Sequence, residues 1–320
     1  MPSSHSDKLS VAVIGARTHH QGTGPWLARF FHKYGAEIIG ILGTSAESAK
    51  NATDELKNRF EIITKPFFRW EDLLAADLPD LLVIASPSHT HRHYLQLALT
   101  ADIPVFCEKP FIWENGRDNL ADTQELINRF RAQKLPLFIN TQLTETIGDF
   151  KRIYPHCDLQ TIHSFEMEMS PASSGKNMLP DSMPHVWSIL TAIAGPGKLA
   201  DFKISFPNPG RCDMRGTYNY ARGSCDLKVT LQRHAQQPRP LAYAINHCRV
   251  ERIIDPADYS MSFKAATGTY PIGDPLEKKV KRILQNLTNA ARGQDIHQQS
   301  LVTITLEMEL LAATLEGCTL

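Results

Sequence analysis

Two short polar blocks of the sequence carry side chains suited to proton and charge chemistry. Each follows an apolar run: Ser86-Pro87-Ser88 comes after Leu81 to Ala85, and Glu108-Lys109-Pro110 comes after Pro104 to Cys107. An ammonium group such as that of Lys109, placed beside a reacting oxygen, stabilises developing negative charge. A lysine after a strand is also commonly a solvated side chain, so Lys109 alone leaves both interpretations open.

A further basic side chain, His185, follows Asp181 by four residues. The apolar spacing beyond it predicts a helix over Met183 to Ala194, stopped by Gly195-Pro196, with His185 in the first turn. A helix N-terminus favours the neutral imidazole, which can act as a base. The alternative is that Asp181 or Ser182 merely caps this helix and that His185 is a surface residue.

The loop after the first apolar run contains glycines but lacks the usual dinucleotide spacing. Dinucleotide sites need glycines there because the backbone must approach a pyrophosphate at a helix N-terminus. Between Gly15 and Gly24, Arg17 stands where a G-x-G-x-x-G pattern has its second glycine. Either the loop binds phosphate through its amides and side chains, or it is an altered connection that has lost the ligand. On the first interpretation the cofactor-binding residues are Gly15, Arg17, Thr18, His19 and Gly22.

The turn after the second strand bears on the choice of dinucleotide. An acidic residue that would bind both ribose hydroxyls of NAD is absent, and Gly43-Thr44-Ser45 occupies the turn. Without that carboxylate a 2′-phosphate is not repelled, and the hydroxyls of Thr44 and Ser45 can hydrogen-bond to it. This favours NADP over NAD, although a Thr/Ser pair here is equally an ordinary helix cap.

These residues require a scaffold in which helices and strands alternate. The sequence predicts helices that open at Pro25 and Ser45, since proline suits a first helical position and serine an N-cap. Strands separated by helices imply right-handed crossovers and a doubly wound parallel sheet. The predicted strands cover 9–14, 37–42, 81–85, 104–107 and 135–140, and two further helices cover 89–101 and 118–133.

Beyond about residue 150 the pattern changes to consecutive strands, which favours an open, mainly antiparallel sheet. We therefore predict two domains, 1–145 for dinucleotide binding and 146–320 for substrate binding and oligomerisation, with the last helices free to pack back on the first domain. The predicted strands cover 161–169, 199–206, 215–220, 224–232, 241–250 and 260–264, and the helices cover 183–194, 276–292 and 299–315.

Taken together, the two polar blocks resemble the glucose-fructose oxidoreductase, inositol dehydrogenase and rhizopine catabolism (Gfo/Idh/MocA) family. In that family a strand ending in a small-Pro turn with a following His precedes a strand ending in Glu-Lys-Pro. The likeness extends along most of the chain, to Phe138-Ile-Asn140, Asp181-Ser-Met-Pro-His185, Asp274-Pro-Leu276 and Ala291-Arg-Gly293.

The resemblance implies a Rossmann domain joined to an α+β domain, and hydride transfer between NAD(P) and a substrate that is often a sugar or polyol. It implies that Lys109 is the catalytic lysine and His185 the proton carrier, with Asp181 and Asn140 orienting the substrate. Trp113 could line the substrate pocket or belong to the core. The residues implied on the nicotinamide side are Ser86, Pro87, Ser88, His91, Glu108 and Lys109.

Two positions depart from the family pattern. Many members carry an acidic residue three after the histidine, where this chain has Ser188. A side chain at Arg17 crowds a pyrophosphate in the usual pose. These departures keep a non-catalytic homologue open as an alternative.

Composition excludes several other classes of protein. Lys+Arg and Asp+Glu both number 34, so the excess positive charge that nucleic acid or an anionic membrane would attract is missing. The N-terminus has no apolar signal core, and the six cysteines lie far apart, which predicts a cytoplasmic protein. His89, His91 and His93 alternate, but residues two apart do not share a helix face, so we expect no metal site.

The sequence thus predicts an NAD(P)-dependent oxidoreductase of a small-molecule substrate that it does not identify. An imine or ketone reductase of a biosynthetic pathway and a nucleotide-binding or scaffold protein are the alternatives. The resemblance also implies a homodimer or tetramer, because another subunit typically covers the open sheet in this family. The apolar residues Leu227, Val229 and Leu231 are compatible with such a covered face, or with one covered by the chain's own helices.

Overall fold

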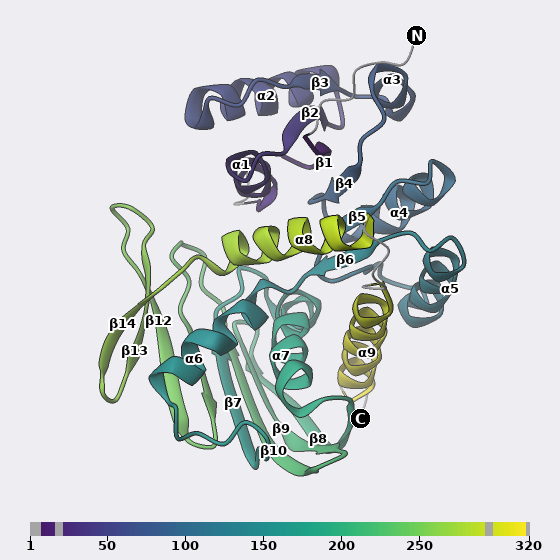
Figure 1. Cartoon of the computed structure of the whole chain (residues 1–320). Coiled ribbons are helices and arrows are strands. Elements are labelled where there is room, and N and C mark those ends of the chain that lie inside the picture. The colour runs from purple at the N-terminus through teal and green to yellow at the C-terminus, as the bar shows by residue number, and fades with distance from the viewer. Residues whose placement is uncertain (1–7, 17–21, 292–296, 318–320) are drawn as a thin grey trace. The chain divides into compact units, whose positions relative to one another are not determined.

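The computed structural model describes residues 8–16, 22–291 and 297–317 (Figure 1). Its contacts divide these residues into two compact units. Unit 1 comprises the chain up to Asn140 together with 279–302, and unit 2 comprises 141–278 together with the residues from Thr303. The segment 279–302 therefore joins the N-terminal part of the chain. The division predicted after residue 145 stays a prediction.

Unit 1 is built on a six-stranded parallel sheet of order β3-β2-β1-β4-β5-β6. The order reverses between β1 and β4, which is where ligands bind in such sheets. This confirms the predicted doubly wound parallel sheet. Its elements are β1 (Ser10–Ile14), α1 (Gly24–Lys33), β2 (Glu37–Leu42), α2 (Ala46–Phe60), β3 (Lys65–Phe67), α3 (Trp70–Ala76), β4 (Leu81–Ile84), α4 (His91–Thr100), β5 (Val105–Glu108), α5 (Asn119–Ala132) and β6 (Leu137–Asn140), with a 3₁₀ turn at Ser88–Thr90 before α4.

The central strands of this sheet are buried on both faces. Val13, Val83 and Val105 are all 0% exposed, as expected of parallel strands covered by helices on either side. The sequence analysis missed β3 and α3, because three residues with a central proline give no strand signal and Trp70–Ala76 is barely two turns long.

Unit 2 is built on an eight-stranded sheet of order β14-β13-β12-β11-β7-β10-β9-β8. Only β7 and β10 pair in parallel, so the predicted open, mainly antiparallel sheet is confirmed. Its elements are α6 (Ile147–Ile153), β7 (Ser164–Met169), α7 (Met178–Ala194), β8 (Gly197–Asn208), β9 (Arg211–Tyr220), β10 (Gly223–Gln232), β11 (Leu241–Ile245), β12 (Cys248–Ile254), β13 (Met261–Ala265) and β14 (Gly268–Ile272), with a 3₁₀ turn at 142–146; α8 (Pro275–Ala291) and α9 (His297–Glu316) close the chain.

The strand predicted over 241–250 is wrong, because the segment is a hairpin. Asn246 and His247 form its turn with φ of 48° and 66°. Positive φ at both central residues is the geometry of a type I′ turn. Asparagine tolerates that conformation, but the absence of a glycine hid the turn from sequence inspection.

The two faces of the unit 2 sheet differ in chemistry. Leu227, Val229 and Leu231 are 4%, 0% and 0% exposed within the single chain, so they face the chain's own core, where α6 and α7 cover the sheet (Figure 1). On the other face Lys228 pairs with Glu166 at 3.0 Å, and Arg249 binds Glu168 through both terminal nitrogens. The apolar stripe therefore gives no support to a subunit interface, and the oligomeric state stays a prediction.

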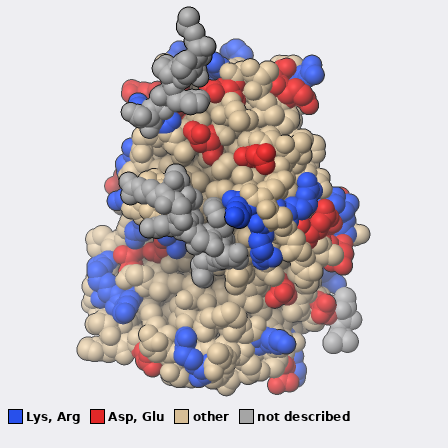
Figure 2. Space-filling view, turned by 45° about the vertical axis from the view of Figure 1, so that its right-hand side comes forward, with Lys and Arg blue, Asp and Glu red and all other residues tan. Residues whose placement is uncertain are grey.

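The surface shows no segregation of charge on the face in view. Figure 2 shows Lys and Arg interspersed with Asp and Glu among the described residues of this face. Such a surface has no extended positive field for a polyanion. Within the described residues, no helix has the length and apolar character needed to cross a membrane.

Candidate functional site

Two glycines let unit 1 close tightly around the carboxyl end of β1. Gly15 has a φ of +85°, and an added Cβ would lie 2.6 Å from the backbone nitrogen of Ser86 and 2.7 Å from the Ala85 carbonyl. An added Cβ at Gly24 would meet the Gly15 oxygen and lie 2.9 Å from the Ala16 Cα. Gly24 thus does what the last glycine of a dinucleotide motif does, which is to let the helix pack closely on the strand.

The start of α1 is tied to the end of β5. Thr23 precedes α1 but makes no side-chain cap; its hydroxyl instead donates to Glu108 Oε1 at 2.5 Å. The first-turn amides of α1 are consequently not capped by that side chain. Gly22 is partly exposed beside it, whereas Arg17, Thr18 and His19, predicted to bind the cofactor, lie outside the described residues.

Glu108 is the centre of this polar cluster. Besides Thr23, its Oε1 accepts a hydrogen bond from Asn140 Nδ2 at 2.7 Å, and its Oε2 accepts one from the Lys109 backbone at 3.2 Å. Asn140 is 1% exposed, so its amide orients Glu108 in this structure; its predicted contact with a substrate stays a prediction. The last residues of β5 and β6 thereby fix the backbone on which Lys109 stands.

His91 holds the other side of the same turn. It is 1% exposed; Nε2 lies 2.7 Å from the Ser86 carbonyl, and Nδ1 lies 3.1 and 3.0 Å from those of Pro110 and Phe111. A neutral ring donates at one nitrogen and a protonated ring at both; burial lowers the pKa of His91 and opposes the second proton. His91 is therefore buried against backbone oxygens in this structure, and its predicted contact with the cofactor stays a prediction.

The residues next to His91 are also engaged. Ser86 Oγ lies 2.7 Å from Thr90 Oγ1, and Ser88 Oγ donates to the Trp113 carbonyl at 3.5 Å. Pro87 is exposed between them. The turn after β4 is thus bound to the segment after β5 at two points, through His91 and through Ser88.

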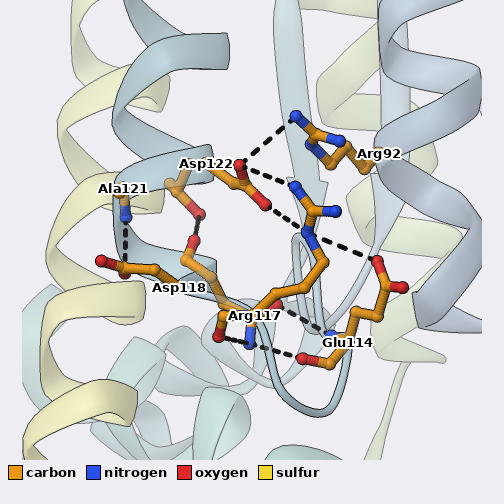
Figure 3. Close-up of polar contacts among 8 residues, drawn as sticks. Arg92, Glu114, Arg117, Asp118, Ala121 and Asp122 are labelled. Atoms are coloured by element: carbon orange, nitrogen blue, oxygen red, sulfur yellow. Dashed lines mark hydrogen bonds and ion pairs between the residues drawn. The ribbon is translucent and has the colours of Figure 1, made fainter.

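The segment that carries Trp113 is held by a network of charges (Figure 3). Arg117 Nε donates to Asp122 Oδ2 at 2.9 Å, and Arg92 reaches the other oxygen of Asp122 at 3.4 Å. Asp118 caps α5 by accepting from the Ala121 amide at 3.0 Å. Residues 113–118 are therefore anchored to α4 and α5, which fixes the backbone of the partly exposed Trp113.

The two hydroxyl side chains that follow β2, those of Thr44 and Ser45, have different surroundings. Ser45 caps α2 by accepting from the Ser48 amide at 3.1 Å, and Ser48 Oγ accepts in return from the Ser45 amide. Thr44 is exposed. The cap interpretation therefore holds for Ser45, and Thr44 Oγ1 lies 3.5 Å from Ser48 Oγ.

Replacing Ser45 by alanine is expected to lower the free energy of unfolding by about 1 kcal/mol, because the Ser48 amide in the first turn of α2 loses its side-chain acceptor. Urea denaturation measures it. Thr44→Ala is the matched control and should stay within about 0.5 kcal/mol of the parent. Equal losses in the two variants would show that the cap contributes nothing.

In unit 2, Asp181 and His185 lie one turn apart on α7. The helix begins at Met178, not at the predicted Met183, because Met178 and Leu179 are fully buried, which offsets the cost of Pro180 and Pro184. His185 is thus in the helix interior and not in its first turn. The argument that the helix N-terminus keeps its ring neutral is wrong, since that effect fades within one turn.

The surroundings of this pair are set by local hydrogen bonds. Ser173 Oγ donates to Asp181 Oδ2 at 2.9 Å, a contact that sequence reasoning missed. Ser188 is buried, and its hydroxyl donates to the His185 carbonyl at 3.0 Å. It therefore occupies the sequence position of the family's acidic residue but supplies no carboxylate. Asp181 and His185 are both partly exposed, whereas most of α7 is buried.

Each unit therefore gathers part of the predicted site. Unit 1 brings together the residues at the ends of β1, β4, β5 and β6, and unit 2 brings together Asp181 and His185. Thr23 and Ser173 contact residues of the predicted site but were not themselves predicted from the sequence. Among the described residues, no three His, Cys, Asp or Glu side chains are grouped so as to hold a metal ion.

Comparison with known proteins agrees with this geometry. Residues 9–141 match the Gfo/Idh/MocA model, described as an oxidoreductase family with an NAD-binding Rossmann fold. The chain is also 37% identical over 76 residues to an inositol 2-dehydrogenase of Corynebacterium glutamicum. That alignment covers 24% of this chain and 21% of the relative, so it spans about a fifth of the relative's length.

Solved structures extend the likeness of fold over nearly the whole chain. UDP-N-acetylglucosamine 3-dehydrogenase from Acidithiobacillus ferrooxidans is 16% identical with a TM-score of 0.67, covering 98% of this chain and 97% of that one. An oxidoreductase from Agrobacterium radiobacter, in complex with NAD⁺, L-tartaric acid and magnesium, is 15% identical with a TM-score of 0.66, covering 98% and 96%. At these identities the likeness establishes the fold.

Proposed function

Because residues 9–141 match the model of the Gfo/Idh/MocA oxidoreductase family, we propose that the chain belongs to that family and that it transfers hydride between a nicotinamide dinucleotide and a sugar- or polyol-like alcohol or its carbonyl form. The observation that carries this proposal is the fastening of the Glu108-Lys109-Pro110 turn. Its carboxylate is held by Thr23 and Asn140, and His91 contacts the carbonyls of Pro110 and of the next residue, Phe111. A turn held from both sides can keep the side chain of Lys109 positioned against a reacting atom.

The residues of unit 1 fit a dinucleotide. Gly15 leaves a cradle that a Cβ would fill, and α1 presents first-turn amides that Thr23 does not cap; both features suit a pyrophosphate. The dinucleotide, when bound, accepts or supplies the hydride. Gly15, Gly22 and the amides of α1 would hold its phosphates, with Arg17, Thr18 and His19 as further proposed contacts, and Ser86, Pro87 and Ser88 would lie on its nicotinamide side.

In the proposed chemistry, Lys109 Nζ hydrogen-bonds to the substrate oxygen and stabilises negative charge on it. A ring nitrogen of His185 takes the hydroxyl proton as the carbinol carbon loses hydride, and it returns the proton in the reverse reaction. Asp181, one turn before His185, would orient the substrate, and Trp113 would line its pocket. The alcohol thus loses one hydride and one proton and becomes the carbonyl.

We propose NADP as the preferred dinucleotide, because the turn Gly43-Thr44-Ser45 after β2 contains no carboxylate to repel a 2′-phosphate and Thr44 is exposed there. NAD is the alternative; it accompanies the Agrobacterium radiobacter neighbour. An imine or ketone substrate remains a second candidate, since Lys109 or His185 could protonate the nitrogen or oxygen as hydride arrives. A cytoplasmic location and a homodimer or tetramer complete the proposal.

Calorimetric titration with NADPH and with NADH tests the dinucleotide site. We expect at least one to bind with a dissociation constant in the micromolar range, about −8 kcal/mol, and NADPH to bind more tightly. Turnover of an alcohol or carbonyl panel with the bound dinucleotide would then exclude a scaffold protein. If neither dinucleotide binds, the scaffold interpretation replaces the enzyme.

A further inference from the structure

The fold of unit 2 brings together two cysteines that lie far apart in the sequence. Cys157 is in the segment between α6 and β7, and Cys248 is the first residue of β12. The register pairs Cys248 with Ile245 across the β11–β12 hairpin. Cys157 Sγ donates to the carbonyl of that same Ile245 at 3.4 Å. The Cys157 sulfur therefore lies against the residue directly opposite Cys248.

Hydrogen bonds hold the two chain segments in this arrangement. Asp158 and Arg249 are the residues that follow the two cysteines. Asn246, in the hairpin turn, donates through Nδ2 to the Asp158 carbonyl at 2.8 Å, and Tyr154 Oη donates to the Arg249 carbonyl at 2.6 Å. The backbone beside each thiol is thus docked on the other segment, which favours a disulfide because its geometry tolerates little displacement of the backbone.

The two thiols interact, and Cys157 holds its proton firmly. Burial raises the pKa of Cys157 to about 12, and the hydrogen bond and the charge of Cys248 add to that shift. The Cys157 thiol also donates its proton to the Ile245 carbonyl, which favours the neutral form. Because the thiolate is the nucleophile in thiol chemistry, we assign the first attack on an oxidant to Cys248 and the second step to Cys157.

Both members of the pair can be reached from solvent. Cys157 and Cys248 are partly exposed free thiols, whereas Cys107, Cys212 and Cys225 are 0% exposed. Burial also raises the pKa of Cys225 to about 12 and that of Cys107 well above its usual range, so these two thiols stay protonated. The pair thus combines access for a small oxidant with a neighbouring thiol.

We propose that Cys157 and Cys248 form a reversible oxidation site, at which a peroxide converts the two thiols into a disulfide. The Cys248 thiolate attacks one oxygen of hydrogen peroxide; the O–O bond breaks, leaving a sulfenic acid on Cys248 and one water. The Cys157 thiol then attacks the Cys248 sulfur; the S–O bond breaks, the S–S bond forms, and a second water leaves with the Cys157 proton. Each sulfur loses one electron and each peroxide oxygen gains one. A dithiol reverses the reaction by exchange.

This site does not depend on the proposed hydride transfer, because neither cysteine belongs to the proposed catalytic or dinucleotide site. The new bond would join the segment after α6 to the β11–β12 hairpin. A link between positions so far apart in the sequence restricts the unfolded chain, so we expect oxidation to raise the midpoint of urea denaturation. In a reducing compartment such a bond is transient and reports the presence of an oxidant.

The test treats the whole reduced protein with a small molar excess of hydrogen peroxide, blocks the remaining thiols and maps the tryptic peptides by mass spectrometry. Cleavage after lysine and arginine, except before proline, releases Cys157 in peptide 153–176 and Cys248 in peptide 234–249. We expect these peptides to be joined, with a mass about 2 Da below their sum because two hydrogens are lost. Dithiothreitol should separate them and return the urea midpoint to that of the reduced protein.

Single substitutions assign the two steps. Cys157→Ser should stop the reaction at the sulfenic acid of Cys248, which dimedone traps, and Cys248→Ser should leave Cys157 as a thiol. Cys318 lies outside the described residues, and Cys318→Ser is the control that should form the link as the parent does. The peptide map of the parent decides the question even if a variant does not fold. Absence of the joined peptides, linkage of either cysteine to a different one, or an equal yield when the protein is oxidised in urea overturns the site.

Discussion

Replacing Lys109 by alanine is expected to lower turnover by about 10²- to 10⁴-fold, the range for loss of a positioned proton-transfer or charge-stabilising group. The backbone around Lys109 is fixed by bonds that do not involve its ammonium: Glu108 is held by Asn140, and the following carbonyls by His91. The variant should therefore keep the fold and most of its dinucleotide affinity. Steady-state kinetics with a substrate found by screening would show the loss in kcat.

Lys57→Ala is the matched control, because it removes an exposed lysine from the last turn of α2 and should leave kcat unchanged. Lys109→Arg keeps the charge but changes its shape and reach, so we expect partial activity. Full activity in Lys109→Ala would exclude this lysine from the reaction and move the catalytic assignment to unit 2.

The second large effect is expected at Gly15. Gly15→Ala should lower the free energy of unfolding by about 2–4 kcal/mol, since it combines strain at positive φ with overpacking against Ala85 and Ser86, 2.6–2.7 Å from the added Cβ. It should also abolish dinucleotide binding, because relief of the clash displaces the turn that forms the cradle. Urea denaturation and calorimetry measure the two effects.

Gly35 provides the control that separates these contributions. Its φ of +92° is close to that of Gly15, but an added Cβ there meets nothing within 4 Å. Gly35→Ala should thus report the strain alone, about 1 kcal/mol, and leave dinucleotide binding intact. If the two variants lose the same stability, the close approach of Gly15 to β4 contributes nothing.

Much of the architecture could be predicted from the sequence because buried parallel strands are short apolar runs and their connections carry strong cap signals. The start of α2 at Ser45 and the span of β2 are examples. The prediction of α7 shows the limit: Pro180 and Pro184 argue locally against a helix, and the burial of Met178 that outweighs them depends on tertiary packing. The start of α7 therefore cannot be predicted from a short stretch of the sequence.

The same distinction applies to the site. The rule that ligands lie at the carboxyl ends of parallel strands directed attention to Glu108 and Lys109, and the family resemblance directed it to Asn140. The partners of these residues could not be found in that way, because Thr23 reaches Glu108 across 85 positions and His91 reaches Phe111 across 20. A side chain read as a cofactor contact can be a structural hydrogen-bonding group, and only the folded chain distinguishes the two.

The bonds of His91 have a consequence for how this scaffold can change during evolution. Its ring binds the backbone oxygens of Ser86, Pro110 and Phe111, and every residue type offers such an oxygen. The hydrogen bonds themselves therefore place no demand on the side chains of these residues. Pro110 and Phe111 are buried and constrained by packing, so the partly exposed Ser86 is the position that can vary. His91 itself has no such latitude, because any replacement must fit a buried site that has backbone oxygens on two sides. His91, which cannot vary, and a residue that can vary thus lie next to each other in the fold.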